Sequence, residues 1–266
     1  MFAVLKIEEP KKRRIFFKKK QKNSLPRVLT EQVDRTTYFT IVTQKENNSI
    51  NWGKIFEAAG RESSRLLIPM HLNPPQKSGV KPYKGEKYLQ KIIINTAFDL
   101  IRRSSVPKEE LVLCLYDYYA KYPEIALSML RHAGTVKVFT ASKSIYSSYN
   151  IAALNTMGTM FLCSDRPPET SSFHLLLAPF GLCDRPVPPY DSPSIYLGNT
   201  ASPYTIGTGC ISLPDEIERN VPPDIDSSVF AAALYERAHL TYLGEKSAAY
   251  LIHNEQKIPV FQIKLS

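Results

Sequence analysis

The stretch Leu111-Val112-Leu113-Cys114-Leu115 opens the part of the sequence that decides the fold, which extends to Gly181. Three further apolar runs follow it: Val136-Lys137-Val138-Phe139-Thr140, Met160-Phe161-Leu162-Cys163 and His174-Leu175-Leu176-Leu177-Ala178. Runs this short, rich in Leu and Val and nearly free of charge, are typical of parallel strands that are buried on both faces of a sheet.

Segments with helical spacing separate the first three runs. In each segment apolar side chains recur three or four residues apart and a glycine follows: Ile125, Ala126, Met129, Leu130, Ala133 and Gly134 in one, Tyr146, Tyr149, Ala153, Leu154, Met157 and Gly158 in the other. Each glycine is predicted to end its helix in the left-handed conformation. The resulting β-α-β-α-β-β unit at 111–181 predicts an α/β fold with a Rossmann-like parallel sheet.

The rest of the chain predicts an N-terminal mixed α/β lobe over 1–85, and C-terminal strands and a helix that extend the Rossmann-like domain over 86–266. In the lobe we expect a hairpin of strands at 2–8 and 13–19, strands at 36–43 and 65–69, a helix at 52–59 capped by Ser49, and a loop at 71–85. Further on we expect a helix at 86–103, strands at 194–197 and 210–213, a helix after Asp226, and a hairpin of 250–253 with 259–263.

Composition and charge narrow the classes of protein that fit. The chain has 266 residues, of which 43% are hydrophobic, and no apolar run approaches the roughly 20 residues of a membrane helix. The formal charge of +9 is local, because residues 1–27 contain ten Lys or Arg and two Glu. The N-terminal residues lack the pattern of a secretory signal. The four cysteines form no C-x-x-C pair, so we expect reduced thiols and a cytoplasmic protein.

The topology predicts where a ligand binds. In an open α/β sheet, ligands bind outside the carboxyl ends of the strands, close to the point where the strand order reverses. Four predicted strands end at that edge, and the candidate ligand-binding residues follow them: Asp117, Tyr118, Ser142, Lys143, Asp165, Pro179, Phe180 and Gly181.

The first turn argues against a dinucleotide cofactor. A Rossmann fingerprint places glycines there so that backbone N–H groups approach the pyrophosphate. This chain has Asp117-Tyr118-Tyr119-Ala120-Lys121-Tyr122-Pro123, with three tyrosines, a carboxylate and no glycine. We therefore predict no cofactor of the NAD or FAD type.

Other chemical groups leave alternatives open. Asp117, Asp165 and Asp184 are candidate acids or metal ligands, although aspartates at strand ends are more often caps and turn formers. Cys183 and Cys210 are candidate nucleophiles without a partner motif. The five histidines show no metal-binding spacing, so no metal is predicted.

Three hypotheses for the function follow. The first is a binding or regulatory module for a small ligand or a protein partner, without nucleotide-dependent catalysis. The second is a dehydrogenase-like oxidoreductase with a divergent cofactor loop. The third is a binder of nucleic acid or an anionic surface through the basic segment 11–22, whose lysines alternatively protect an edge hairpin from aggregation. No catalytic motif decides whether the protein is an enzyme.

Overall fold

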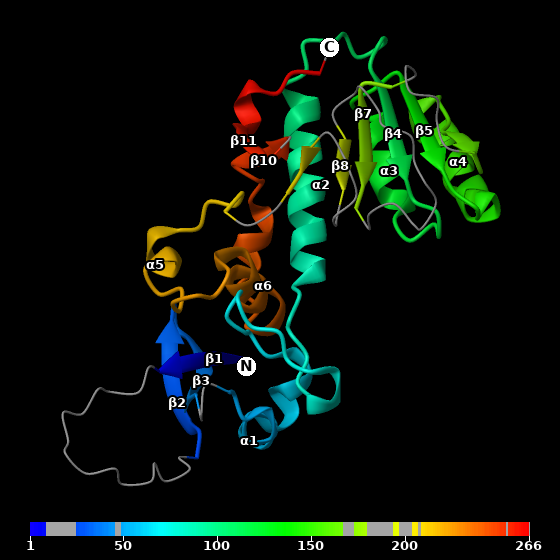
Figure 1. Cartoon of the computed structure of the whole chain (residues 1–266). Coiled ribbons are helices and arrows are strands. Elements are labelled where there is room, and N and C mark those ends of the chain that lie inside the picture. The colour runs from blue at the N-terminus through cyan, green and yellow to red at the C-terminus, as the bar shows by residue number, and fades with distance from the viewer. Residues whose placement is uncertain are drawn as a thin grey trace, which may run out of the picture. The chain divides into compact units, whose positions relative to one another are not determined.

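The computed structural model describes residues 1–8, 25–45, 49–166, 173–179, 194–196, 204–206, 209–253 and 255–265 (Figure 1). The chain divides into two compact units. The first unit consists of Met1–Tyr88 and Leu213–Leu243, and the second of Leu89–Ser212 and Gly244–Ser266. Both units are therefore built from segments that are far apart in the sequence. The boundary near residue 85 stays a prediction.

A mixed sheet forms the centre of the second unit, which is α/β as predicted. Its strands are β4 (Val112–Tyr116), β5 (Thr135–Phe139), β6 (Leu162–Ser164), β7 (Leu175–Ala178), β8 (Ser194–Tyr196), β9 (Tyr204–Thr205), β10 (Tyr250–His253) and β11 (Gln256–Pro259). Among the described residues their order is β11-β10-β9-β8-β7-β4-β5-β6. Neighbouring strands from β6 to β9 are parallel, and β10 pairs antiparallel with β9 and β11.

Strand β4 is the point at which the order of the sheet reverses. It lies between β5, which pairs Leu113 with Val136, and β7, which pairs Leu113 with Leu175. The chain adds β5 and β6 on one side of β4 and then returns to the other side for β7 and β8. Leu113 and Leu115 are fully buried, as expected for a central strand.

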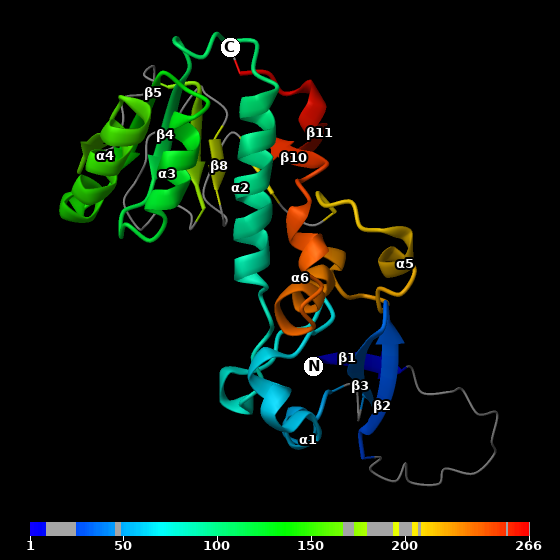
Figure 2. The same ribbon diagram turned by 180° about the vertical axis from the view of Figure 1, so that it is seen from behind.

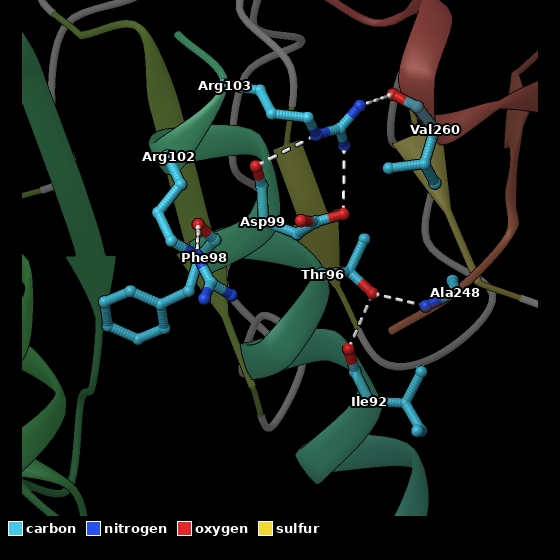
Figure 3. Close-up of polar contacts among 8 residues, drawn as sticks. All are labelled: Ile92, Thr96, Phe98, Asp99, Arg102, Arg103, Ala248 and Val260. Atoms are coloured by element: carbon cyan, nitrogen blue, oxygen red, sulfur yellow. Dashed lines mark hydrogen bonds and ion pairs between the residues drawn. The ribbon is translucent and has the colours of Figure 1, made fainter. Parts of the chain in front are cut away.

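Three helices accompany this sheet: α2 (Glu86–Arg102), α3 (Pro123–Leu130) and α4 (Lys143–Met157). Helix α3 packs against β5 and α4, and α4 packs against β6 (Figure 2). Helix α2 is tied to the C-terminal segment by hydrogen bonds. Thr96 Oγ1 accepts from the Ala248 N–H (2.8 Å), and Arg103 Nη1 donates to Val260 O (3.2 Å; Figure 3).

The first unit combines a small sheet with helices from both of its segments. Strands β1 (Ala3–Glu8), β2 (Arg27–Val33) and β3 (Thr36–Gln44) have the order β1-β3-β2, with α1 (Trp52–Ala59), α5 (Asp215–Glu218) and α6 (Ser227–Arg237) as helices. The ring of Phe230 in α6 packs edge-on against the rings of Phe2 and Tyr38, with distances of 5.9 and 5.6 Å between the ring centres. Through this aromatic cluster, α6 shares the hydrophobic core of the N-terminal sheet.

Short 3-10 helices complete the described structure: η1 (Gly60–Arg65), η2 (Gln76–Ser78), η3 (Thr241–Glu245) and η4 (Val260–Gln262). The last of these corrects the predicted C-terminal hairpin, whose second strand is β11 and not 259–263. The strand expected at 210–213 is also absent. The strand that pairs with β10 at this place in the sheet is instead β9, in which Thr205 is the partner of Ile252.

Two helix-end predictions were wrong. Asn51, and not Ser49, caps α1, since its side chain accepts from the Lys54 N–H (3.2 Å). Gly134 is not left-handed, and α3 already ends before Arg131. Glycine is needed at position 134 because a Cβ atom at this position would lie 2.4 Å from the Glu109 carbonyl oxygen. Gly158 does end α4 with φ of 69°, and Asp226 does cap α6.

The edge strands also depart from expectation. Strand β6 is not buried on both faces, because Leu162 is 57% exposed at the end of the sheet. Strand β2 was not predicted, since four successive side chains at its start are exposed and obscure any alternation. The predicted strand at 13–19, and with it the basic segment, lies outside the described residues.

Candidate functional site

The Asp117 carboxylate organises the turn that follows β4. It is 2% exposed and accepts three hydrogen bonds: from the Lys121 N–H to Oδ1 (2.9 Å), and from the Tyr122 N–H (2.8 Å) and the Tyr146 hydroxyl (2.9 Å) to Oδ2. A buried carboxylate requires such donors, because burial without them costs several kcal/mol. Asp117 thus joins β4, the start of α3 and α4.

The turn held in this way presents a tyrosine to solvent. The Ala120 N–H donates to the Asp117 carbonyl (3.0 Å), and Ala120 has a positive φ of 49°. A non-glycine residue rarely adopts this conformation unless its surroundings impose it. Tyr119 is 61% exposed, and Lys121 Nζ lies 5.8 Å from the centre of its ring.

The segment after β5 lies beside this turn. The Ala141 N–H and Thr140 Oγ1 both donate to the Tyr118 carbonyl, at 3.0 and 3.3 Å. The Ser142 N–H donates to Thr140 Oγ1 (3.1 Å), which orients the entry into α4. Two of the predicted site residues, Tyr118 and Ser142, are therefore connected through a short chain of hydrogen bonds.

Lys143 reaches the segment after β6. Its Nζ lies 3.2 Å from Asp165 Oδ1, and both side chains are exposed. The hydrogen bond from Lys143 lowers the pKa of Asp165. A pair this exposed contributes little to stability, because water screens both charges. It does place one cation and one anion at the carboxyl edge of the sheet.

The other predicted site residues follow β7. Pro179 is buried immediately after this strand, which neighbours β4. Phe180 and Gly181 lie outside the described residues, as do Asp184 and Cys183. The structure thus brings together Asp117, Tyr118, Ser142, Lys143 and Asp165, with Pro179 at the end of the adjacent strand.

The hydroxyl groups around Asp117 remain protonated. Burial is the main reason that the pKa of Tyr146 is raised, and the charge of Asp117 and its hydrogen bond add to this effect. Burial and the Asp117 charge also raise the pKa of Tyr122. These phenols are donors and not proton acceptors at neutral pH, so the carboxylate and its partners form a structural network.

Two cysteines of the sheet, Cys114 and Cys163, are not activated as nucleophiles. Burial raises the pKa of Cys114 to about 12, and it also raises the pKa of Cys163. Of the two candidate nucleophiles, Cys210 is buried and Cys183 lies outside the described residues. His174 is structural, because its Nδ1 accepts from the Val112 N–H (3.0 Å). Within the described ranges, no group of His, Cys, Asp or Glu side chains is arranged to hold a metal ion.

Sequence reasoning missed two depressions in the second unit, on the side of the sheet where the parallel strands begin. One, of about 440 Å³, is lined by Lys108, Leu130, Arg131, Ala133, Gly134, Met157 and Thr159. The other, of about 380 Å³, is lined by Asn95, Phe98, Arg102, Ser128, Arg131 and His132. The signal in the sequence was a basic residue at the end of α2 and another after α3, and such residues are ordinary at helix C-termini.

The part of the chain that the structure describes contains no helix that is both long and apolar enough to span a membrane. Comparison with known proteins found no family model, no curated protein and no solved structure that matches this chain.

Proposed function

We propose that the second unit is a Rossmann-like domain that serves as a binding or regulatory module without nucleotide-dependent catalysis. Its strand order supports the fold assignment. Numbered along the chain from β4, the strands β6-β5-β4-β7-β8-β9 follow the order 3-2-1-4-5-6 of doubly wound dinucleotide-binding sheets.

The observation that carries the functional proposal is the role of Asp117. In a dinucleotide-binding turn, backbone N–H groups are directed at the pyrophosphate. Here the N–H groups of Ala120, Lys121 and Tyr122 donate to Asp117 itself. A diphosphate would have to displace these bonds and approach a buried carboxylate of like charge. The turn therefore fixes the backbone around Tyr119 and is not suited to bind a dinucleotide.

The surface that this turn supports has the composition of a binding site. An exposed tyrosine on a fixed backbone is typical of residues that dominate binding energy, because little side-chain entropy is lost when it is covered. Tyr119 is such a residue, and Lys121, Lys143 and Asp165 add charges of both signs close to the same edge. This combination suits a small polar ligand or a loop of a partner protein.

The test is a screen of metabolite mixtures against the 15N-labelled full chain, read by amide chemical shifts. A ligand of the carboxyl edge is expected to shift the amide signals of Tyr118, Tyr119 and Lys143. Tyr119→Ala should weaken binding at least tenfold, a loss of about 1.4 kcal/mol. Tyr250→Ala, which removes a 39% exposed tyrosine from β10, should leave it unchanged. Shifts that avoid this edge for every ligand would contradict the proposal.

The strand order also favours a second candidate, the dehydrogenase-like oxidoreductase. Its test is calorimetry with NAD(H), NADP(H), FAD and S-adenosylmethionine. We expect no binding at the carboxyl edge tighter than about millimolar, which corresponds to about 4 kcal/mol. Micromolar affinity for any of them, together with shifted amide signals of Tyr118 and Lys143, would favour the oxidoreductase. A cytoplasmic location also stays a prediction, for which the free thiols of Cys114 and Cys163 are support.

A further inference from the structure

Four basic groups converge at the amino edge of the parallel sheet, on the side away from the carboxyl-edge surface. Arg102 ends α2, Lys108 precedes β4, and Arg131 and His132 follow α3. Arg131 lines both depressions of the second unit, with Lys108 in one of them and Arg102 and His132 in the other. Residues separated by up to 30 positions in the sequence thus surround one region.

The basic side chains of this cluster have no carboxylate beside them in either depression, although Glu109 and Glu110 directly follow Lys108 in the chain. Neither depression is lined by an acidic side chain, and no ion pair between described residues includes Arg102, Lys108 or Arg131. Figure 3 shows Arg102 beside Phe98, to whose carbonyl its Nε donates at 3.1 Å. Arg103, the next residue, pairs instead with Asp99 at 3.1 Å.

The positive charges of the cluster act on His132. Burial is the largest cause of its lowered pKa, and the charges of Arg102, Lys108 and Arg131 lower it further. All three cations therefore act on the same point. Placing like charges together destabilises the folded protein unless a helix C-terminus or an anion compensates. The helix ends account for Arg102 and Arg131, but Lys108 lies in the loop before β4.

The walls of the depressions suit an organic phosphate. The guanidinium group of arginine binds phosphate oxygens bidentately, and lysine adds a point charge. Phe98, Leu130 and Met157 supply apolar surface, and Ser128 and Thr159 supply hydroxyl groups. The two depressions, of about 440 and 380 Å³, are open to solvent, so a small ligand would lie against their walls and stay partly exposed.

We propose that this amino-edge cluster is a binding site for a small phosphorylated metabolite, with the phosphate held by Arg131 between Lys108 and Arg102. The apolar part of the ligand packs against Phe98 or against Leu130 and Met157. The site lies apart from the carboxyl-edge surface, so it stands whether or not that surface binds a ligand.

The test uses the full chain and two probes, inorganic pyrophosphate and AMP, in calorimetry and amide chemical-shift titrations. We expect both probes to shift the amide signals of Lys108 and of Arg131 to Gly134. Lys108→Gln and Arg131→Gln should each weaken binding about tenfold, since each removes a charge-assisted hydrogen bond. Arg131→Lys should restore part of the affinity. Lys91→Gln, which removes an exposed cation of α2, is the matched control and should bind normally.

Two outcomes would overturn this proposal. If Lys91→Gln weakens binding as much as Arg131→Gln, the probes respond only to net charge. If binding is lost when Lys18, Lys19, Lys20 and Lys22 are changed together to Gln but survives in Arg131→Gln, the anion binds the basic N-terminal segment. Thermal unfolding of each variant shows whether it is folded, so a misfolded variant is not mistaken for a loss of the site.

Discussion

The Tyr146 hydroxyl donates a 2.9 Å hydrogen bond to the Asp117 carboxylate, and this bond links α4 to the turn after β4. Both groups are buried. Because the same carboxylate holds the backbone of residues 121 and 122, the position of the exposed Tyr119 depends on a contact with Tyr146, which lies 29 residues after Asp117 in the chain.

Tyr146→Phe tests this link. The change removes one of three donors to a buried carboxylate, so we expect the free energy of unfolding to fall by about 1–3 kcal/mol. Urea denaturation followed by circular dichroism measures it. The control is Tyr149→Phe, whose hydroxyl donates to Glu124 in an exposed position and whose loss should change stability little. If Tyr146→Phe changes stability as little as Tyr149→Phe, the hydrogen bond from Tyr146 to Asp117 does not stabilise the fold.

Tyr88→Phe is expected to act in the opposite direction. The Tyr88 ring is fully buried against Tyr235, and its hydroxyl has no hydrogen-bond partner among the described residues. Removing a buried, unpaired hydroxyl relieves a desolvation cost, so the unfolding free energy should stay equal or rise by about 1 kcal/mol. A loss of more than about 1 kcal/mol in urea denaturation would mean that this hydroxyl is hydrogen-bonded.

Gly134→Ala should destabilise the second unit, because the new Cβ would lie 2.4 Å from the Glu109 carbonyl oxygen. Overpacking of this kind costs about 1–3 kcal/mol. The matched control is Gly53→Ala in α1, where the nearest atom is at 3.5 Å and alanine favours the helix by up to about 1 kcal/mol. Thermal denaturation should therefore give a lower Tm for the first variant and an equal or higher Tm for the second.

Stability should fall at alkaline pH. Burial raises the pKa of Tyr88 to about 12, and it also raises the pKa of Tyr38, Tyr83 and Tyr146. These phenols keep their protons in the folded state while the unfolded chain loses them near pH 10, so the unfolded state binds fewer protons. The stabilisation is complete below pH 10 and is lost progressively above it.

The measurement is urea denaturation from about pH 8 to pH 11.5, with native tyrosine ionisation followed by absorbance. We expect part of the tyrosine absorbance change to appear only on unfolding. If all tyrosines of the folded protein ionise near pH 10, the buried phenols are accessible to water and the explanation is wrong.

The sequence by itself determined the alternation of strands and helices in the second unit. The apolar runs of β4, β5 and β7 can be recognised without knowing their partners, because burial of a central strand on both faces leaves few polar positions; Lys137 of β5 is an exception. Local chemistry also determined some ends, such as the Asp226 cap of α6 and the left-handed Gly158. In these cases the hydrogen bond or the backbone conformation involves only residues close in the sequence, so a few residues are enough to predict the end of the helix.

Only the tertiary structure decided what depends on distant partners. The strand β9 forms because β8 and β10 lie beside it, and α6 joins the N-terminal core because Phe230 meets Phe2 and Tyr38. The carboxylate of Asp117 could be recognised as a candidate, but its use as an internal acceptor depends on Tyr146. Arg102, Lys108 and Arg131 likewise come together only through the packing of α2 and α3. Their mutual interaction depends on the distance between the charges in space and not on their separation in the sequence.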